Sequence, residues 1–350
     1  MEAGTASSEP VVHHWAGNIN CLPPVGKAPC NLSEYKTMIF SNLRLPKLLA
    51  ALACTAVVPP AAADLIVGLT ADNRLLSFSS ASPTALTNDV AISGLQSGET
   101  VLAIDLRPSN GLLYGLGSSN RVYVFDAATG AVTSSVVMSG AALSGFAFGI
   151  DFNPVADSTG LPSLRVVSDA DQNLRIDVVT GAVTVDSMLV AGSPPGSVNP
   201  TIGGSAYSNN FFGATSTTLY NIDYNFDRLV IQSPPNEGRL MRVGELLPMG
   251  PPPGGADLTN DLLGFDISGT SGIAYASLTS PTGTGSYLYT VNLATGAATA
   301  VGSIGENQTL RGLSVLNFVP EPGSAALAGL GLLTMLAHGR WRRSATPACA

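Results

Sequence analysis

Three aspartates recur at one position of a repeated strand pattern, and they are the side chains most able to do chemistry together. Each lies between two apolar residues, in Ile104-Asp105-Leu106, Ile150-Asp151-Phe152 and Phe265-Asp266-Ile267. In a repeat protein such equivalent positions converge on an axis or a rim. The three carboxylates could then bind a cation or a sugar, or supply the carboxylate pair, roughly 5–10 Å apart, of a glycoside hydrolase. The favoured interpretation, however, is that each aspartate caps the turn after its own strand.

A second acidic segment, residues 169–173, has the D-x-D-x-N spacing of a calcium loop, with Asp169 and Asp171 at its acidic positions. A calcium loop of this kind also needs Gly at its sixth position and Glu at its twelfth. Here those positions hold Leu174 and Thr180. The two aspartates are therefore weak candidate metal ligands, like the three repeated ones, and a plain hairpin turn is the favoured interpretation.

The residue types missing from the central part of the chain limit the catalytic and metal sites that it can form. Residues 64–318 contain no His, Cys, Lys or Trp. This composition excludes Ser–His triads, Cys nucleophiles, Lys Schiff bases, His-bound zinc and Cys-bound clusters. Without Trp there is no strong platform for stacking a sugar ring. We predict no catalytic residue and no cofactor apart from calcium, and a carboxylate-dependent glycosidase is the alternative.

The charge balance argues against anionic partners. The chain has 16 Lys and Arg against 24 Asp and Glu, a formal net charge of −8, and residues 64–318 hold 9 Arg against 20 acidic residues, a net of −11. Because binding to nucleic acid depends on cations that displace phosphate counterions, nucleic acid is excluded as a general partner. We expect a monomer with a soluble surface, whose partners are extracellular polysaccharide or other matrix proteins.

The N-terminal part of the chain predicts export. Two basic residues precede an apolar run at residues 48–58, and small residues follow up to Ala63. This is the pattern of a secretory signal peptide, here residues 38–63, cleaved by signal peptidase between Ala63 and Asp64. The run is shorter than the roughly 20 residues that span a bilayer, and a buried N-terminal helix is the alternative. Residues 1–37 are interpreted as a mis-assigned or disordered extension.

A turn sequence that recurs three times indicates a β repeat. The copies are D-A-A-T-G-A-V-T at residues 126–133, D-V-V-T-G-A-V-T at 177–184 and N-L-A-T-G-A-A-T at 292–299. Each follows an apolar strand pattern, its Asp or Asn can start a turn and its Gly permits a positive φ. Each copy therefore predicts a strand–turn–strand hairpin, with degenerate copies at residues 223–227 and 79–83.

Two further strands are predicted before each hairpin. They lie at residues 102–106 and 112–116, at 148–152 and 164–167, at 202–207 and 211–214, and at 263–267 and 273–276. Four strands per unit is the content of a β-propeller blade. Residues 234–257 are interpreted as an insertion that contains an extra strand and a loop.

The two ends of this region predict a fifth blade. Residues 310–316 have the pattern of a first strand, and residues 65–69, 74–78 and 84–92 have those of second, third and fourth strands. Joined together they would close the ring and leave no open sheet edge. We therefore predict an all-β, five-bladed β-propeller over residues 64–318, closed by its N- and C-terminal strands. A β-sandwich or an open β-solenoid is the alternative.

Two arginines on neighbouring predicted strands, Arg165 and Arg175, are expected to form ion pairs. Their candidate partners are Asp151, Asp169 and Asp177. Ion pairs of this kind contribute little at a surface.

Several short motifs in this region occur in a characteristic order. They are G-I-D-F-N-P at residues 149–154, L-R-V-V-S at 164–168, N-L-R at 173–175, G-G-S-A-Y-S-N-N at 203–210 and L-Y-N-I-D at 219–223. With them, residues 64–316 resemble a secreted bacterial family known as domain of unknown function 4394. The resemblance implies a propeller-like fold and no reaction, because the family has no assigned activity.

The C-terminal part of the chain carries a three-part pattern. A V-P-E-P motif precedes an apolar stretch at residues 324–337, and a basic cluster follows. The motif and the cluster consist of Val319, Pro320, Glu321, Pro322, Arg340, Arg342 and Arg343. This order resembles the PEP-CTERM sorting signal of Gram-negative bacteria over residues 319–343, with residues 344–350 as a tail. A tail helix with a chance motif is the alternative.

The resemblance to the sorting signal implies a partner and a location. The protease exosortase would process the chain after signal peptidase has acted. The apolar segment would pause as a transmembrane helix in the inner membrane, with the basic cluster on the cytoplasmic side. We therefore predict an exported, non-enzymatic binding or scaffolding module at the outer surface of the cell envelope or in the extracellular matrix.

Overall fold

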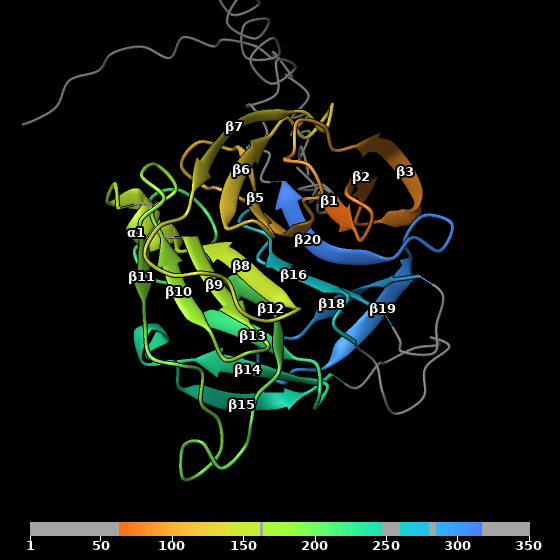
Figure 1. The fold of residues 1–350 in the computed structure, drawn as a ribbon. Coiled ribbons are helices and arrows are strands. Elements are labelled where there is room, and N and C mark those ends of the chain that lie inside the picture. The colour runs from red at the N-terminus through yellow and green to blue at the C-terminus, as the bar shows by residue number, and fades with distance from the viewer. Residues whose placement is uncertain (1–62, 162–163, 247–259, 280–284, 317–350) are drawn as a thin grey trace, which may run out of the picture. The chain divides into compact units, whose positions relative to one another are not determined.

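Five antiparallel sheets of four strands each lie around one axis in the computed structural model, which describes residues 63–161, 164–246, 260–279 and 285–316 (Figure 1). Blade 1 contains β20 (Leu310–Leu316), β1 (Leu65–Thr70), β2 (Arg74–Ser79) and β3 (Ser82–Ala91). Blade 2 contains β4 (Val101–Leu106), β5 (Leu113–Gly117), β6 (Arg121–Phe125) and β7 (Val132–Val137). Blade 3 contains β8 (Phe148–Phe152), β9 (Leu164–Ser168), β10 (Asn173–Ile176) and β11 (Val183–Val185). Blade 4 contains β12 (Ile202–Tyr207), β13 (Leu219–Asp223), β14 (Arg228–Gln232) and β15 (Leu240–Glu245), and blade 5 contains β16 (Leu263–Ile267), β17 (Ala274–Leu278), β18 (Tyr287–Val291) and β19 (Ala298–Ser303).

The first strands of the five blades form a closed ring at the axis. Strand β20 contacts β4, β4 contacts β8, β8 contacts β12, β12 contacts β16, and β16 contacts β20 (Figure 1). Blade 1 is completed by strands from both ends of the region, since β1 pairs with β20 from Leu65↔Leu316 to Leu69↔Gly312. The predicted five-bladed propeller and its closure by terminal strands are confirmed.

The direction of the first strands defines two faces of the propeller. Because each blade is an antiparallel meander and the first strands run the same way around the axis, all loops between first and second strands lie on one face. Strand β20 ends on this face at Leu316 and β1 begins there at Leu65, so we call it the terminal face. The loops between second and third strands, and those between blades, lie on the opposite face.

The hydrophobic core is divided among the interfaces between blades. Each of the five apolar clusters joins residues from two neighbouring blades. Val122 of blade 2, for example, shares a cluster with Val166 of blade 3. This division explains why the inner strands are apolar on both faces. The smallest cluster lies between blades 3 and 4 and has six buried residues.

Blade 4 differs from the prediction in its strand positions. Residues 211–214 form no strand, and Gly213, at φ 90°, lies in the loop before β13. Residues 223–227 join the second and third strands, not the third and fourth, and β15 is the regular fourth strand, not an extra one. The apolar pair Phe211-Phe212 gave this loop the composition of a strand. By contrast, residues 79–83 do join the third and fourth strands of blade 1.

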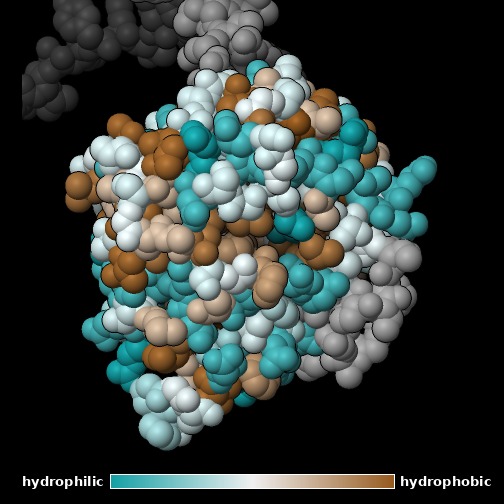
Figure 2. Space-filling view, viewed as in Figure 1, coloured by the Kyte–Doolittle hydropathy of each residue, from teal (hydrophilic) through white to brown (hydrophobic). Residues whose placement is uncertain are grey.

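Helices make up little of the described chain. They are α1 (Pro154–Ser158) and the 3₁₀ helix η1 (Pro235–Glu237), so within the described ranges no helix is long and apolar enough to cross a membrane. The predicted extension, signal peptide, sorting signal and tail lie outside the described residues. On the side of the propeller that Figure 2 shows, hydrophobic and hydrophilic side chains are interspersed.

Candidate functional site

The three repeated aspartates meet at the propeller axis. Asp105 on β4, Asp151 on β8 and Asp266 on β16 each offer a carboxylate oxygen, and these oxygens lie within 4.8 Å of one another. All three residues are buried, with at most 2% of their surface exposed. The convergence expected from their equivalent positions is therefore present in the fold.

Each aspartate binds the backbone of the next blade. Oδ2 of Asp105 accepts a hydrogen bond of 2.8 Å from the N–H of Phe152, and Oδ2 of Asp151 accepts one of 2.7 Å from the N–H of Tyr207. Oδ2 of Asp266 accepts one of 2.6 Å from the N–H of Val315. The aspartates thus join first strands of neighbouring blades. The favoured interpretation, in which each caps the turn after its own strand, is wrong.

The same position is occupied by other residues in the remaining two blades. Ser314 holds it in blade 1, and its Oγ accepts a hydrogen bond of 2.9 Å from the N–H of Leu106. Blade 4 has Ala206 there, which has no acceptor, and the N–H of Ile267 is bound instead by Oδ1 of its own neighbour, Asp266, at 2.6 Å. Four of the five blades therefore contribute a side chain to this ring of inter-blade bonds.

The ring belongs to a longer repeat that the sequence reasoning missed, because Ser314 and Ala206 are not acidic. The repeat places a small residue two positions before the ring position, in Ala103-Ile104-Asp105, Gly149-Ile150-Asp151, Gly204-Ser205-Ala206, Gly264-Phe265-Asp266 and Gly312-Leu313-Ser314. The small residue lets first strands approach closely: a Cβ added at Gly149 would lie 2.6 Å from the backbone nitrogen of Ser205. Aligning the five first strands on this residue would have found the complete ring.

Burial changes the acidity of the cluster. It raises the pKa of Asp105 and of Asp151 well above the ordinary value, and the neighbouring carboxylates raise both further. Burial also raises the pKa of Asp266 to about 7, although the N–H groups of Val315 and Ile267 oppose the shift. Among the described residues, Oδ1 of Asp151 is buried without a hydrogen-bond partner.

This chemistry fits a proton-sharing cluster better than a calcium site. Calcium takes six to eight oxygen ligands, whereas a backbone N–H already binds one oxygen of each aspartate. Protons neutralise buried carboxyls without any further ligand. A pocket between the first strands, lined by Ile104, Ile150 and Phe265 among others, has a volume of about 10 Å³, room for roughly one water molecule.

Asp169 and Asp171 form a hairpin turn, as the favoured interpretation predicted. Oδ1 of Asp169 accepts a hydrogen bond of 2.8 Å from the N–H of Phe146, and Oδ2 accepts one of 3.1 Å from the hydroxyl of Tyr224. Asp171 has a positive φ of 59°, and its N–H donates to the carbonyl of Ser168. The turn joins β9 to β10, and Asp169 ties it to blade 4.

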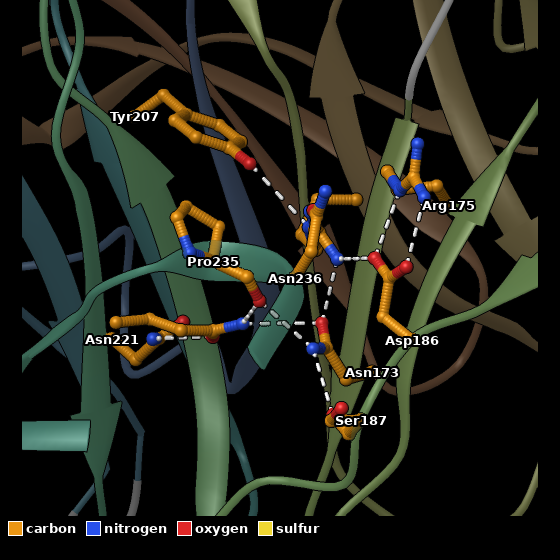
Figure 3. A network of polar contacts seen from close by, with 10 residues as sticks. Asn173, Arg175, Asp186, Ser187, Tyr207, Asn221, Pro235 and Asn236 are labelled. Atoms are coloured by element: carbon orange, nitrogen blue, oxygen red, sulfur yellow. Dashed lines mark hydrogen bonds and ion pairs between the residues drawn. The ribbon is translucent and has the colours of Figure 1, made fainter. Parts of the chain in front are cut away.

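A buried arginine organises a polar network that the sequence reasoning did not predict (Figure 3). Arg165 on β9 is 1% exposed. Its Nη1 donates to Oδ2 of Asp186 at 2.6 Å and to Oδ1 of Asn173 at 2.7 Å, and its Nη2 donates to Oδ1 of Asn236 at 2.6 Å. Arg175 donates twice to Asp186, at 2.8 Å each. Burial alone would raise the pKa of Asp186, but the bonds from Arg175 and Arg165 outweigh it and lower that pKa.

The ion-pair partners predicted for Arg165 and Arg175 are not the ones observed. Neither Asp151, Asp169 nor Asp177 forms an ion pair with them among the described residues, and Asp186 receives both. The expectation of a surface pair is also wrong for Arg165, which is buried.

The network crosses between blades 3 and 4. The side-chain amide of Gln232 on β14 donates to Oδ1 of Asn173 on β10 at 3.1 Å, and the amide of Asn173 donates to the carbonyl of Pro235 at 2.9 Å. Arg165 itself reaches Asn236 beyond β14. Because these partners lie about 60 residues apart in the chain, no local pattern in the sequence indicates them.

Comparison with known proteins places the chain in a family. Residues 74–314 match the family model described as domain of unknown function (DUF4394). No curated protein matches the chain.

Three solved structures are similar at low identity. They are the hydrazine synthase of Kuenenia stuttgartiensis (14% identity, TM-score 0.34, covering 60% of this chain and 49% of that one), the dihydro-heme d1 dehydrogenase NirN in complex with DHE (12%, 0.32, 69% and 44%) and a structural genomics protein of unknown function from Bacteroides thetaiotaomicron (14%, 0.41, 74% and 68%). The chain spans about half the length of the first two. Similarity at such low sequence identity and TM-score supports no inference about function.

Proposed function

Since the chain belongs to the DUF4394 family, we propose that its propeller is an exported, non-catalytic binding and scaffolding module of a Gram-negative cell surface or extracellular matrix. The observation that carries this proposal is the use of Asp105, Asp151 and Asp266. All three are buried and bound to the backbone of the next blade. The carboxylates that would be the first choice for catalysis are thus committed to holding the ring together.

The residue inventory supports the same proposal. Residues 64–318 lack His, Cys and Lys, so Cys and Lys nucleophiles and His general bases are absent from the propeller. A propeller instead offers a broad rim of loops, and loops on a rigid scaffold are the usual place for recognition. The acidic surface suits neutral hydrated polymers, and we propose extracellular polysaccharide or another matrix protein as the partner of a monomeric chain.

The start of the fold supports export with cleavage after Ala63. Ala63 is exposed, whereas Asp64 is buried and its N–H donates to Oγ of Ser80 at 3.0 Å. The carboxylate of Asp64 accepts hydrogen bonds from Ser268 and Tyr275, both at 3.0 Å. Removal of the chain up to Ala63 would therefore leave these contacts intact.

Sorting through the C-terminal pattern is the second part of the proposal. Signal peptidase would release the N-terminus, and exosortase would process residues 319–343 after the apolar stretch has held the chain in the inner membrane. Intact-mass analysis of the native product tests both steps. We expect a species that begins at Asp64 and lacks Arg340, Arg342 and Arg343, and a product that retains either end contradicts the proposed sorting.

Binding is tested separately from sorting. We expect the mature chain to co-sediment with neutral extracellular polysaccharide and to release no reducing sugar from it. Heat-unfolded chain is the control for non-specific adsorption. Absence of binding to polysaccharides and to isolated matrix proteins would contradict the binding role.

A secreted glycosidase is the second candidate, favoured by the approach of three carboxylate oxygens within 4.8 Å. Retaining enzymes hold their two carboxyl groups about 5–5.5 Å apart, but those groups must face the sugar. The variants Asp105→Asn, Asp151→Asn and Asp266→Asn, assayed on a polysaccharide panel, separate the two candidates. Activity in the parent chain that disappears in one variant with an unchanged melting temperature would establish the enzyme.

A further inference from the structure

Exposed apolar side chains lie on both faces of the propeller, since Phe146 in a loop between blades is 87% exposed, but on the terminal face they recur in equivalent loops. Each of the four intact loops between first and second strands carries at least one large apolar residue. They are Leu112 (46% exposed), Leu161 (69%), Phe211 (46%), Phe212 (61%) and Ile273 (39%). Single exposed apolar residues are ordinary on soluble proteins, but here they recur at the same place in blades 2, 3, 4 and 5.

Hydrogen bonds join these loops to one another. Asp157 in α1 of the blade 3 loop accepts from Nε of Arg107 at 2.7 Å and from the N–H of Ser109 at 2.8 Å, both in the blade 2 loop. Oγ of Ser158 accepts from the N–H of Gly213 in the blade 4 loop at 2.7 Å. The apolar side chains of these three loops are therefore presented by one connected surface.

The blade 5 loop is joined in the same way to the place where the chain enters blade 1. Oγ of Ser268 and Oγ of Ser271 donate to the carboxylate of Asp64, at 3.0 and 2.6 Å. Between blades 1 and 2 the same face opens into a hollow of about 360 Å³, lined mainly by apolar residues. Leu112 and Leu316 both line it. The face is thus apolar around the point where the described chain ends.

The chain beyond this point contains the apolar stretch at residues 324–337. Seven residues separate Leu316 from Ser324, and eight peptide steps span at most about 28 Å when fully extended. If the stretch lies in a bilayer, the terminal face must remain within that distance of the membrane, whereas the opposite face need not.

The charges on the terminal face favour a neutral membrane over an anionic one. In the turns between third and fourth strands, on the terminal face, three acidic residues (Asp126, Asp177 and Glu237) outnumber one basic residue (Arg239), and Arg107 is paired with Asp157. Such a face is repelled by anionic headgroups but can place Phe and Leu side chains in the interface of a neutral bilayer.

We propose that the terminal face rests on the surface of a neutral lipid bilayer, with Leu161 and Phe212 among the side chains that enter the interface. This inference depends on the membrane-anchored stage of the proposed function. It adds the orientation of the propeller, whose opposite face is left open for binding.

Tryptophan placed in the face reports its contact with lipid. The variants are Phe212→Trp and Leu161→Trp, in two different loops, with Val301→Trp on β19 as the matched control, since Val301 is also exposed but lies in a fourth strand, away from these loops. The chain, with its C-terminal segment, is reconstituted into phosphatidylcholine vesicles with and without brominated acyl chains. The emission of the parent chain, which has two Trp, is subtracted.

We expect the added emission at positions 212 and 161 to shift to shorter wavelength in vesicles and to be quenched by brominated lipid, with neither change at position 301. Chain that floats with the vesicles but shows no more quenching at 212 and 161 than at 301 overturns the inference and leaves the anchoring intact. Chain that does not float contradicts the anchoring and the inference together. A blue shift without vesicles, with a dimer in sedimentation, would assign the face to a second copy and also overturn the inference.

Discussion

Replacing Asp266 by Asn tests whether bound protons keep the buried carboxyl groups at the propeller axis neutral. Burial raises the pKa of Asp266 from 3.8 to about 7, and each unit corresponds to 1.36 kcal/mol, so the shift is worth about 4 kcal/mol. Because the folded-state pKa lies above the unfolded one, this contribution to stability is complete below pH about 4 and is lost as the pH rises through about 7. Asp266→Asn removes the dependence, because the amide does not ionise.

The substitution also has a cost that does not depend on pH. Oδ1 and Oδ2 of Asp266 accept from the N–H groups of Ile267 and Val315, at 2.6 Å each, and Asn retains only one of these acceptors. A buried N–H left without an acceptor costs about 1–3 kcal/mol. We therefore expect the parent chain to be the more stable below pH about 4, and the variant to be the more stable above pH about 7.

The assay is urea unfolding followed by circular dichroism at a series of pH values from about 3 to 8.5. The quantity of interest is the difference in free energy of unfolding between parent and variant, in which the contributions of other titrating groups largely cancel. Asp261→Asn, at an exposed aspartate just before β16, is the matched control for the loss of a carboxylate outside the cluster. A difference for Asp266→Asn that is flat, or that rises with pH, would show that protons do not neutralise the buried cluster.

Three further substitutions test the joints between blades, each by urea unfolding at constant pH. Arg165→Leu should destabilise the propeller by about 3–5 kcal/mol, because it leaves buried partners uncompensated. The side chain of Arg175 is 34% exposed, so Arg175→Leu should cost about 1 kcal/mol or less. Equal effects would contradict a buried network centred on Arg165. Gly149→Ala should cost about 1–3 kcal/mol through overpacking, because its Cβ would lie 2.6 Å from a backbone nitrogen of β12, and an unchanged midpoint would show that the strands can separate freely. Ser314→Ala should cost about 1–3 kcal/mol by leaving the N–H of Leu106 without an acceptor, and restoration by Ser314→Thr would identify the hydroxyl as the cause.

The fold was predictable because its local signals repeat. Turns with Asp or Asn followed by x-x-T-G-A-x-T mark the hairpins at residues 126–133, 177–184 and 292–299, and turn chemistry depends on the backbone over a few residues only. Closure by β1 and β20 followed from counting incomplete units at both ends. Blade 4 was assigned wrongly at residues 211–214 because an apolar pair in an exposed loop has the composition of a short strand.

The site was predictable only in part, for a related reason. Asp105, Asp151 and Asp266 share a residue type and a flanking pattern, so their convergence could be inferred. Ser314 and Ala206 occupy the same position but differ in type. What each side chain binds depends on the neighbouring blade. Each aspartate accepts a hydrogen bond from the backbone of the next blade, and this results from packing between blades, which no single strand encodes.

Two of the five interfaces between blades differ in their balance of polar and apolar contacts. Between blades 4 and 5 the ring position is Ala206, which supplies no hydrogen bond, and the apolar cluster there has thirteen buried residues. Between blades 3 and 4 the apolar cluster has only six, and this is the interface that Asp151 and the Arg165 network cross. Polar joints are directional, so they fix the register of neighbouring strands as well as their distance. A fourth carboxylate at position 206 would also add charge to a cluster whose pKa values are already raised, which gives a physical reason why alanine stands at an interface with a large apolar cluster.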